Sequence, residues 1–167
     1  MIEVVEANLA SSGHAGALVR LLNEYALDPM GGGSALSRYA TANLAAELHR
    51  RDSAHVLLAH VDAAPAGLMI CFEGFSTFAC KPLLNIHDVM VTRQHRGKGV
   101  ARRMLETAEA IARRLDCCKL TLEVLEGNHT ARAAYSALGF AGYELDPRMG
   151  KAMFWQKKLD RTAVRTG

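Results

Sequence analysis

The sequence predicts a mixed α/β (α+β) domain, because segments with strand and with helix periodicity alternate along the chain as far as residue 159. A length of 167 residues suits one domain that is large enough to bury its own core. Half of the residues are hydrophobic and 22% are charged, which excludes a disordered or collagen-like chain. We therefore expect a single domain over residues 1–159 and a polar, disordered tail over residues 160–167.

The N-terminal half predicts one strand, two helices and a hairpin. Apolar residues from Leu18 to Tyr25 fall at helical spacing, and the run Gly31–Ser34 separates them from a second helical segment. We expect this glycine run to form a mobile connector. Two apolar stretches flank Asp62–Pro65, as the strands of an antiparallel hairpin flank their turn. The expected elements are a strand over 2–6, helices over 12–25 and around 44–51, and strands over 55–61 and 66–72.

Residues 85–115 predict a strand, a glycine loop and an amphipathic helix in direct succession. The strand over 85–91 is rich in Ile and Val, and apolar positions from Ala101 to Leu115 mark one helical face. The loop Gln94-His95-Arg96-Gly97-Lys98-Gly99-Val100-Ala101 offers backbone N–H groups and a helix dipole to an anion. Neither the P-loop pattern nor the dinucleotide-binding pattern is present. We expect the loop to bind a phosphate, with a structural turn as the alternative.

The segment after this helix predicts another strand with one apolar and one polar face. Leu120, Leu122 and Val124 alternate with polar residues over 120–125, so Glu123 is expected on the polar face of the strand. The remaining expected elements are a helix over 131–138 that ends at Gly139 and two closing strands over 140–145 and 152–159.

Composition and charge speak against several other classes of protein. The formal net charge of +3 is a mild excess, and the basic residues near the loop do not form a stripe, so we expect no nucleic-acid partner. No segment approaches the roughly 18 apolar residues of a membrane helix, and no signal peptide is apparent, which predicts a cytoplasmic protein without a membrane partner. The spacing of histidines and cysteines predicts no metal site and four reduced, mostly buried thiols.

Two motifs occur about one helix and one strand apart. The first is the loop around Arg96-Gly97-Lys98-Gly99, and the second is Asn128-x-x-Ala131-x-x-x-Tyr135-x-x-x-Gly139-Phe140. Together they resemble the GCN5-related N-acetyltransferase (GNAT) superfamily, most closely over residues 84–140. The resemblance implies a mixed, mostly antiparallel sheet of six or seven strands, flanked by about four helices. Its central parallel strands, here 85–91 and 120–125, would splay apart to admit the pantetheine arm of acetyl-coenzyme A.

The resemblance also implies an activity and a set of cofactor contacts. The expected activity is transfer of an acetyl group from acetyl-coenzyme A to a primary amine of a small molecule, peptide or protein, by direct attack in a ternary complex and without a metal. The residues expected to bind the cofactor are Val89, Met90 and Val91 on the strand, Arg96, Gly97, Lys98, Gly99, Val100 and Ala101 in the loop, and Asn128 and Tyr135 beyond it. A helix N-cap is an alternative role for Asn128.

Acetyl transfer to an amine calls for a base and an acid. An alkyl amine with a pKa near 10 is protonated at pH 7, and freeing its lone pair costs on the order of 4 kcal/mol. The resemblance assigns Tyr135 as the acid that protonates the departing thiolate, with a packed core tyrosine as the alternative. Glu123 is one candidate base, or else a solvated strand residue. Asp88 and His87, on the other central strand, are rival bases or amine-binding groups.

A catalytically silent acetyl-coenzyme A sensor or interaction module is the alternative function. The presence of Tyr135 favours the enzyme, because a sensor needs the loop but not the tyrosine. The acceptor is expected to contact the first two helices, the loop over 31–34 and the segment over 72–84. Aminoglycosides, polyamines, amino acids and protein N-termini all fit, and both a monomer and a homodimer are compatible with the sequence.

Overall fold

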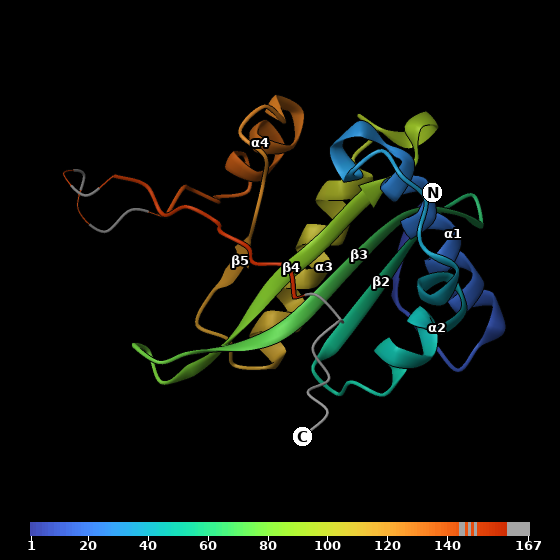
Figure 1. Cartoon of the computed structure of the whole chain (residues 1–167), viewed down its shortest axis with the longest axis horizontal. Helices are drawn as coiled ribbons and strands as arrows, with labels where there is room; N and C mark the ends of the chain where they lie inside the picture. Colours follow the sequence, from blue (N-terminus) through green and yellow to red (C-terminus); the bar gives the residue numbers. More distant parts are fainter. Residues whose placement is uncertain (144–145, 147, 149, 160–167) are drawn as a thin grey trace, which may run out of the picture.

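A five-stranded mixed sheet forms the centre of the fold, with the strands in the order β1-β2-β3-β4-β5 (Figure 1). The structure is a computed structural model, which describes residues 1–143, 146, 148 and 150–159 of the chain. Each strand from β1 to β4 pairs antiparallel with the next, and β5 pairs parallel with β4. The strands are β1 (Ile2–Glu6), β2 (Ala54–Val61), β3 (Ala64–Ser76), β4 (Lys81–Val91) and β5 (Leu120–Leu122).

Helices cover both faces of this sheet. α1 (Ser12–Leu27) and α2 (Arg38–His49) pack on one face, and α3 (Val100–Arg114) crosses the other (Figure 1). α4 (His129–Ser136) follows β5, and its Tyr135 packs against the hydrophobic cluster on the α3 side. The expected α/β (α+β) class is confirmed, with four α-helices in the described part of the chain.

Strands β2 and β3 supply alternate side chains to the two hydrophobic clusters of the core. Leu57 and Met69 pack with α3, whereas Leu58 and Leu68 pack with α1. Successive side chains of a strand point to opposite faces, so apolar runs of this kind fit a sheet that is covered on both sides. At Gly67 of β3, a β-carbon would lie only 3.0 Å from side-chain atoms of the first turns of α3. This glycine therefore allows the N-terminus of α3 to lie close against the sheet.

The two central parallel strands pair over only three residues. The register joins Leu84 to Leu120 at one end and Ile86 to Leu122 at the other. β5 ends there, whereas β4 continues to Val91. A β-bulge lies at the same place, since Ile70 and Cys71 of β3 pair with Asp88 and Ile86, which leaves His87 as the extra residue. A bulge bends its strand. The expected separation of β4 and β5 is therefore present, beginning directly after Ile86.

The strand count and the closing strands differ from expectation. The sheet has five strands within the described residues rather than six or seven, and neither 140–143 nor 152–159 is a strand; residues 144 and 145 lie outside the described part. Met153, Phe154 and Trp155 follow one another and are all strongly exposed, so they cannot alternate between a buried and a solvated face. One long backbone hydrogen bond of 3.5 Å, from the N–H of Ala152 to the carbonyl of Tyr143, joins the two segments. The expected tail over 160–167 lies outside the described residues.

The four cysteines differ in burial from what the sequence predicts. All four cysteines are free, as expected, but only Cys71 is buried, whereas Cys117 is half-buried and Cys80 and Cys118 are exposed. The expectation of mostly buried thiols is therefore wrong, because Cys80 lies at the tip of the β3–β4 hairpin and Cys118 precedes β5.

Among the described residues, no helix is long and apolar enough to cross a membrane.

Candidate active site

The glycine loop connects the end of β4 to the start of α3. A short 3-10 helix, η2 (Arg93–His95), leads into it. Gly97 and Gly99 have φ angles of 73° and 86°, in the left-handed region that favours glycine. Gly99 is the N-cap of α3 and provides no side-chain cap, so the first amides of the helix keep their hydrogen-bonding capacity for a ligand. The local geometry therefore fits an anion such as a pyrophosphate.

Arg96 is held on both sides by hydrogen bonds of its guanidinium group. Its Nε donates to the carbonyl of Val91 over 3.1 Å, and its Nη2 donates to Oδ2 of Asp28 over 2.8 Å. Asp28 lies at the end of α1, and the guanidinium of Arg96, together with the N–H of Met30, holds the pKa of its carboxyl group below the ordinary value. The start of the loop is thereby attached both to the end of β4 and to the end of α1.

Beyond Ile86, the edge of β4 on the side of β5 has no paired strand, and this unpaired edge is called the opening below. Val89 and Val91 are half-buried, and Met90 is buried in the cluster beneath α1. Beyond the three paired residues, β4 does not pair with β5. A linear ligand that enters between the strands would therefore meet the backbone of Val89, Met90 and Val91, as the sequence predicts.

Tyr135 lies half-buried on α4. Its ring packs against that of Phe140, with a centroid distance of 5.9 Å and an interplanar angle of 59°. Burial, and to a smaller extent the neighbouring Tyr25, raises the pKa of Tyr135 above its ordinary value. The hydroxyl is therefore protonated at neutral pH, as a proton donor must be. The packed position alone also suits a core residue, so the role of Tyr135 stays a prediction.

Asn128 caps the helix that carries Tyr135. Its Oδ1 accepts a hydrogen bond of 3.2 Å from the N–H of Ala131. The alternative role of Asn128 as an N-cap is therefore confirmed. Its contact with the cofactor stays a prediction.

Asp88 on β4 and Tyr25 on α1 both have raised pKa values. Burial raises the pKa of the Asp88 carboxyl group, and the adjacent His87 partly opposes that shift. Burial also raises the pKa of Tyr25, with further contributions from the charges of Asp88 and Asp28. The charge of Tyr25 also contributes to the raised pKa of Tyr135, and the two tyrosines pack against different hydrophobic clusters. The sequence analysis missed Tyr25, because its helical spacing marked it only as a core position.

Glu123 lies outside the strand on which it was expected. β5 ends at Leu122, and Glu123 is exposed in the connection to α4. The alternation that predicted a strand over 120–125 continues to Val124, but the pairing with β4 stops at Ile86 and the strand ends with it. Asp88 and Glu123 thus both come just after the last paired residues. His87 is exposed, and its ring meets that of Phe72 edge-on at 5.5 Å.

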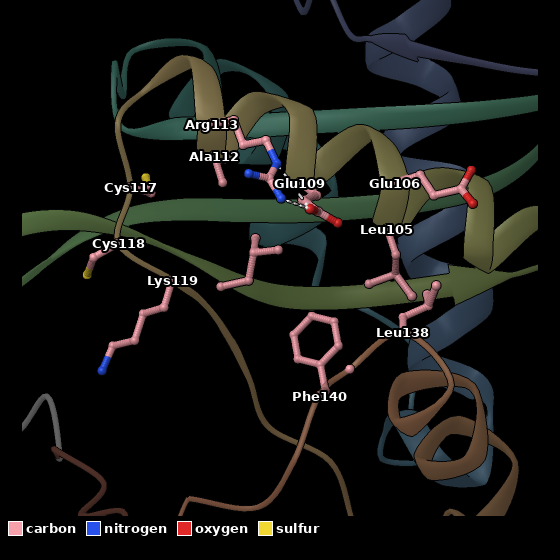
Figure 2. A pocket seen from close by; sticks show the side chains of 12 residues that line it. Leu105, Glu106, Glu109, Ala112, Arg113, Cys117, Cys118, Lys119, Leu138 and Phe140 are labelled. Atoms are coloured by element: carbon pink, nitrogen blue, oxygen red, sulfur yellow. Dashed lines mark hydrogen bonds and ion pairs between the residues drawn. The ribbon is translucent and has the colours of Figure 1, made fainter.

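A groove lined by α3, the start of β5 and the segment after α4 is distinct from the loop and the opening. It is a cavity of about 330 Å³ between α3, β5 and the segment after α4 (Figure 2). Figure 2 shows Leu105, Leu138 and Phe140 along one side of it and the Glu109–Arg113 ion pair on α3. None of the loop residues from Arg96 to Ala101 lines this groove. In the described residues there is also no group of three or more side chains suited to a metal ion.

Comparisons with known proteins agree with this architecture. A family model described as the acetyltransferase (GNAT) family matches residues 18–140. A streptothricin acetyltransferase of Streptomyces lavendulae is 39% identical over 75 residues, which make up 45% of this chain and 40% of the relative. The matched part is thus less than half the length of that relative.

Solved structures share the fold at low sequence identity. A structure described as a probable acetyltransferase has a TM-score of 0.79 and 19% identity. The match covers 95% of this chain and 99% of the chain of that structure. The structure of AAC(6')-Iy in complex with a bisubstrate analog, CoA-S-monomethyl-acetylneamine, has a TM-score of 0.74 and 16% identity. The match covers 95% of this chain and 99% of the AAC(6')-Iy chain. These likenesses establish the shared fold.

Proposed function

The chain belongs to the acetyltransferase (GNAT) family, and we propose that it transfers the acetyl group of acetyl-coenzyme A to a primary amine by direct attack in a ternary complex. The observation that carries this proposal is the separation of β4 from β5 directly after Ile86 and Leu122. This opening leads to the glycine loop at the end of β4, so one extended ligand can contact both.

The loop and the opening suit the two chemically different parts of coenzyme A. The pyrophosphate would lie on the amides from Gly97 to Ala101, where the left-handed glycines and the start of α3 favour a compact anion. Lys98 adds positive charge there, whereas the charge of Arg96 is paired with Asp28. The uncharged pantetheine arm would run along the backbone of Val89, Met90 and Val91. Acetyl-coenzyme A is thus the co-substrate that supplies the activated acetyl group.

The reaction forms an N–C bond and breaks the C–S bond of the thioester. The amine loses a proton to a base, and the leaving thiolate gains one. We assign the proton donor as Tyr135, whose phenol keeps its proton at neutral pH because burial raises its pKa. Thiolate, with an ordinary pKa of about 8.5, is a better leaving group when a donor protonates it.

For the base we favour Asp88 over Glu123. Asp88 is on β4 in the separated region, and burial raises its pKa, which makes it a stronger base than an exposed carboxylate. Glu123 flanks the same opening from the other side, but it is exposed in the connection to α4. An exposed carboxylate can still act through an ordered water, so Glu123 is the second candidate and His87 the third.

We propose a small-molecule amine as the acceptor, on the basis of the similarity to a streptothricin acetyltransferase. The test is a panel of amines, with streptothricin first, followed by aminoglycosides, polyamines and a peptide N-terminus, assayed by release of free coenzyme A and by mass spectrometry of the product. We expect release to depend on the amine and to match the acetylated product mole for mole. Binding of acetyl-coenzyme A without acetylation of any amine would instead favour a catalytically silent module.

A further inference from the structure

One ion pair joins the glycine loop to the connector between α1 and α2. Oδ2 of Asp28 accepts a hydrogen bond of 2.8 Å from Arg96, although the two residues are 68 positions apart in the sequence. The side chain of Asp28 is 24% exposed and that of Arg96 is 53% exposed, so the pair is partly open to solvent. Arg96 is the first residue of the loop to which we assign the pyrophosphate.

Asp28 also organises the connector itself. Its Oδ1 accepts from the N–H of Met30, and its backbone carbonyl accepts from Gly31 and Gly33 over 2.8 Å and 3.2 Å. The carboxylate thereby starts a short 3-10 helix, η1 (Pro29–Gly31). One side chain therefore fixes the turn of the connector with one oxygen and holds the cofactor loop with the other.

The connector in turn lies directly against Tyr25. A β-carbon at Gly31 would overlap the carbonyl oxygen of Tyr25, so only glycine fits this contact. Tyr25 itself packs against the hydrophobic cluster on the α1 side of the sheet, which includes Met90 of β4. A continuous set of contacts thus runs from Arg96 through Asp28 and the connector to Tyr25.

We propose that the Asp28–Arg96 pair couples the two sites, so that binding of coenzyme A at the loop orders the connector and Tyr25 on the acceptor side. Asp28 is then a positioning residue. The loop contains two glycines in left-handed conformations and the connector contains Gly31, Gly32 and Gly33, so both segments have conformational freedom that a ligand can restrict. An anion that immobilises the loop also immobilises Arg96, and its ion pair extends that order to the connector. The inference rests on the proposed binding of coenzyme A to the loop.

Hydrogen exchange of the intact chain, with coenzyme A as the probe, tests this coupling without knowledge of the acceptor. In the wild type, coenzyme A should slow exchange at the amides of 97–102 and also, by roughly fivefold or more, at the hydrogen-bonded amides of Met30, Gly31, Gly33 and Ser34. Asp28→Asn keeps an acceptor for the N–H of Met30 but removes the charge that pairs with Arg96. This variant should retain protection of the loop and lose most of the ligand-dependent protection of the connector.

A matched control separates coupling from a general effect of a lost ion pair. Asp116→Asn removes the exposed pair between Lys81 and Asp116, which lies away from the loop, and it should leave both responses unchanged. A purely structural role for Asp28 would speed connector exchange equally with and without coenzyme A, and that result would overturn the coupling. Protection of the loop without protection of the connector in the wild type would also overturn it. No protection of the loop in the wild type would instead remove the proposed cofactor site, and the coupling with it.

Discussion

Ile86 and Leu122 form the last register pair between β4 and β5, and the two strands separate immediately beyond them. The separation coincides with the bulge at His87 and with the end of β5. Asp88 and Glu123 are the two carboxylates considered as bases. Asp88 is the first acidic residue after Ile86, and Glu123 is the first acidic residue after Leu122. Both candidate bases therefore closely follow the last paired residues of the two parallel strands.

Gly99→Glu should abolish binding of acetyl-coenzyme A. The substitution places a side chain at a φ of 86° and a negative charge where the pyrophosphate is expected. At 100 times its dissociation constant, the ligand should stabilise the wild type by about 2.7 kcal/mol, and the variant should lose most of this, as measured by thermal denaturation. Gly16→Glu is a control on α1, where a β-carbon would meet open space. An undiminished ligand shift in Gly99→Glu would remove the loop from the binding site.

Asp88→Asn should slow turnover at pH 7 and should recover in part as the pH rises toward the pKa of the amine. The raised pKa of Asp88 makes it a stronger base than an ordinary carboxylate, whereas at high pH solvent deprotonates the amine without help. The measurement is the pH dependence of kcat/KM for Asp88→Asn and Glu123→Gln side by side. A wild-type profile for Asp88→Asn, with a slow Glu123→Gln, would transfer the role to Glu123.

Tyr135→Phe should lower kcat by roughly 100-fold or more while the affinity for acetyl-coenzyme A barely changes. The substitution removes one oxygen and keeps the ring that packs on Phe140, so the free energy of unfolding should fall by no more than about 1 kcal/mol. Turnover and cofactor affinity are measured on the same preparation. Near-normal turnover with an amine that the wild type acetylates would mean that Tyr135 is only a packing residue.

Glu6→Gln should weaken the loss of stability in acid. The carboxyl group of Glu6 is partly buried, which raises its pKa, but hydrogen bonds from His55 and Arg114 outweigh this and hold the pKa below its ordinary value of 4.5. A group with a lowered pKa stabilises the fold above that ordinary value and ceases to do so as the pH falls through the pKa of the folded state. Thermal denaturation between pH 2 and pH 7 should therefore show a shallower acid decline in Glu6→Gln.

Glu3→Gln is the matched control for this effect, because Glu3 is exposed on the same strand. The same acid decline in Glu6→Gln and the wild type would show that the contacts of Glu6 with His55 and Arg114 add nothing to stability. His55 also bonds to Glu73 through its other ring nitrogen over 2.8 Å, so the three residues join β1, β2 and β3.

The parts of the fold that local pattern specifies could be predicted from the sequence. The strand over 2–6 and the helix that begins at Ser12 agree with the structure, as does the helix after Gly99, because periodicity and glycine punctuation act over a few residues. Gly97 and Gly99, which belong to the predicted anion-binding loop, both have positive φ angles.

Features that depend on distant partners could not be predicted in the same way. The alternation that reaches Val124 gives no sign that pairing stops at Leu122, because pairing depends on β4, which has its bulge directly after Ile86. The contact between Asp28 and Arg96 joins two loops 68 residues apart, and no local pattern encodes it. Tyr25 was hidden for the same reason, since Asp88, whose charge raises its pKa, comes from β4.

A crystal structure of the chain with bound coenzyme A would test the central claim most directly. We expect the pantetheine arm to pass between β4 and β5 beyond Ile86 and Leu122, with the pyrophosphate on the amides from Gly97 to Ala101. The thiol should lie within hydrogen-bond reach of the hydroxyl of Tyr135. Coenzyme A in the groove between α3 and β5, or a pyrophosphate that makes no contact with the loop, would contradict the account.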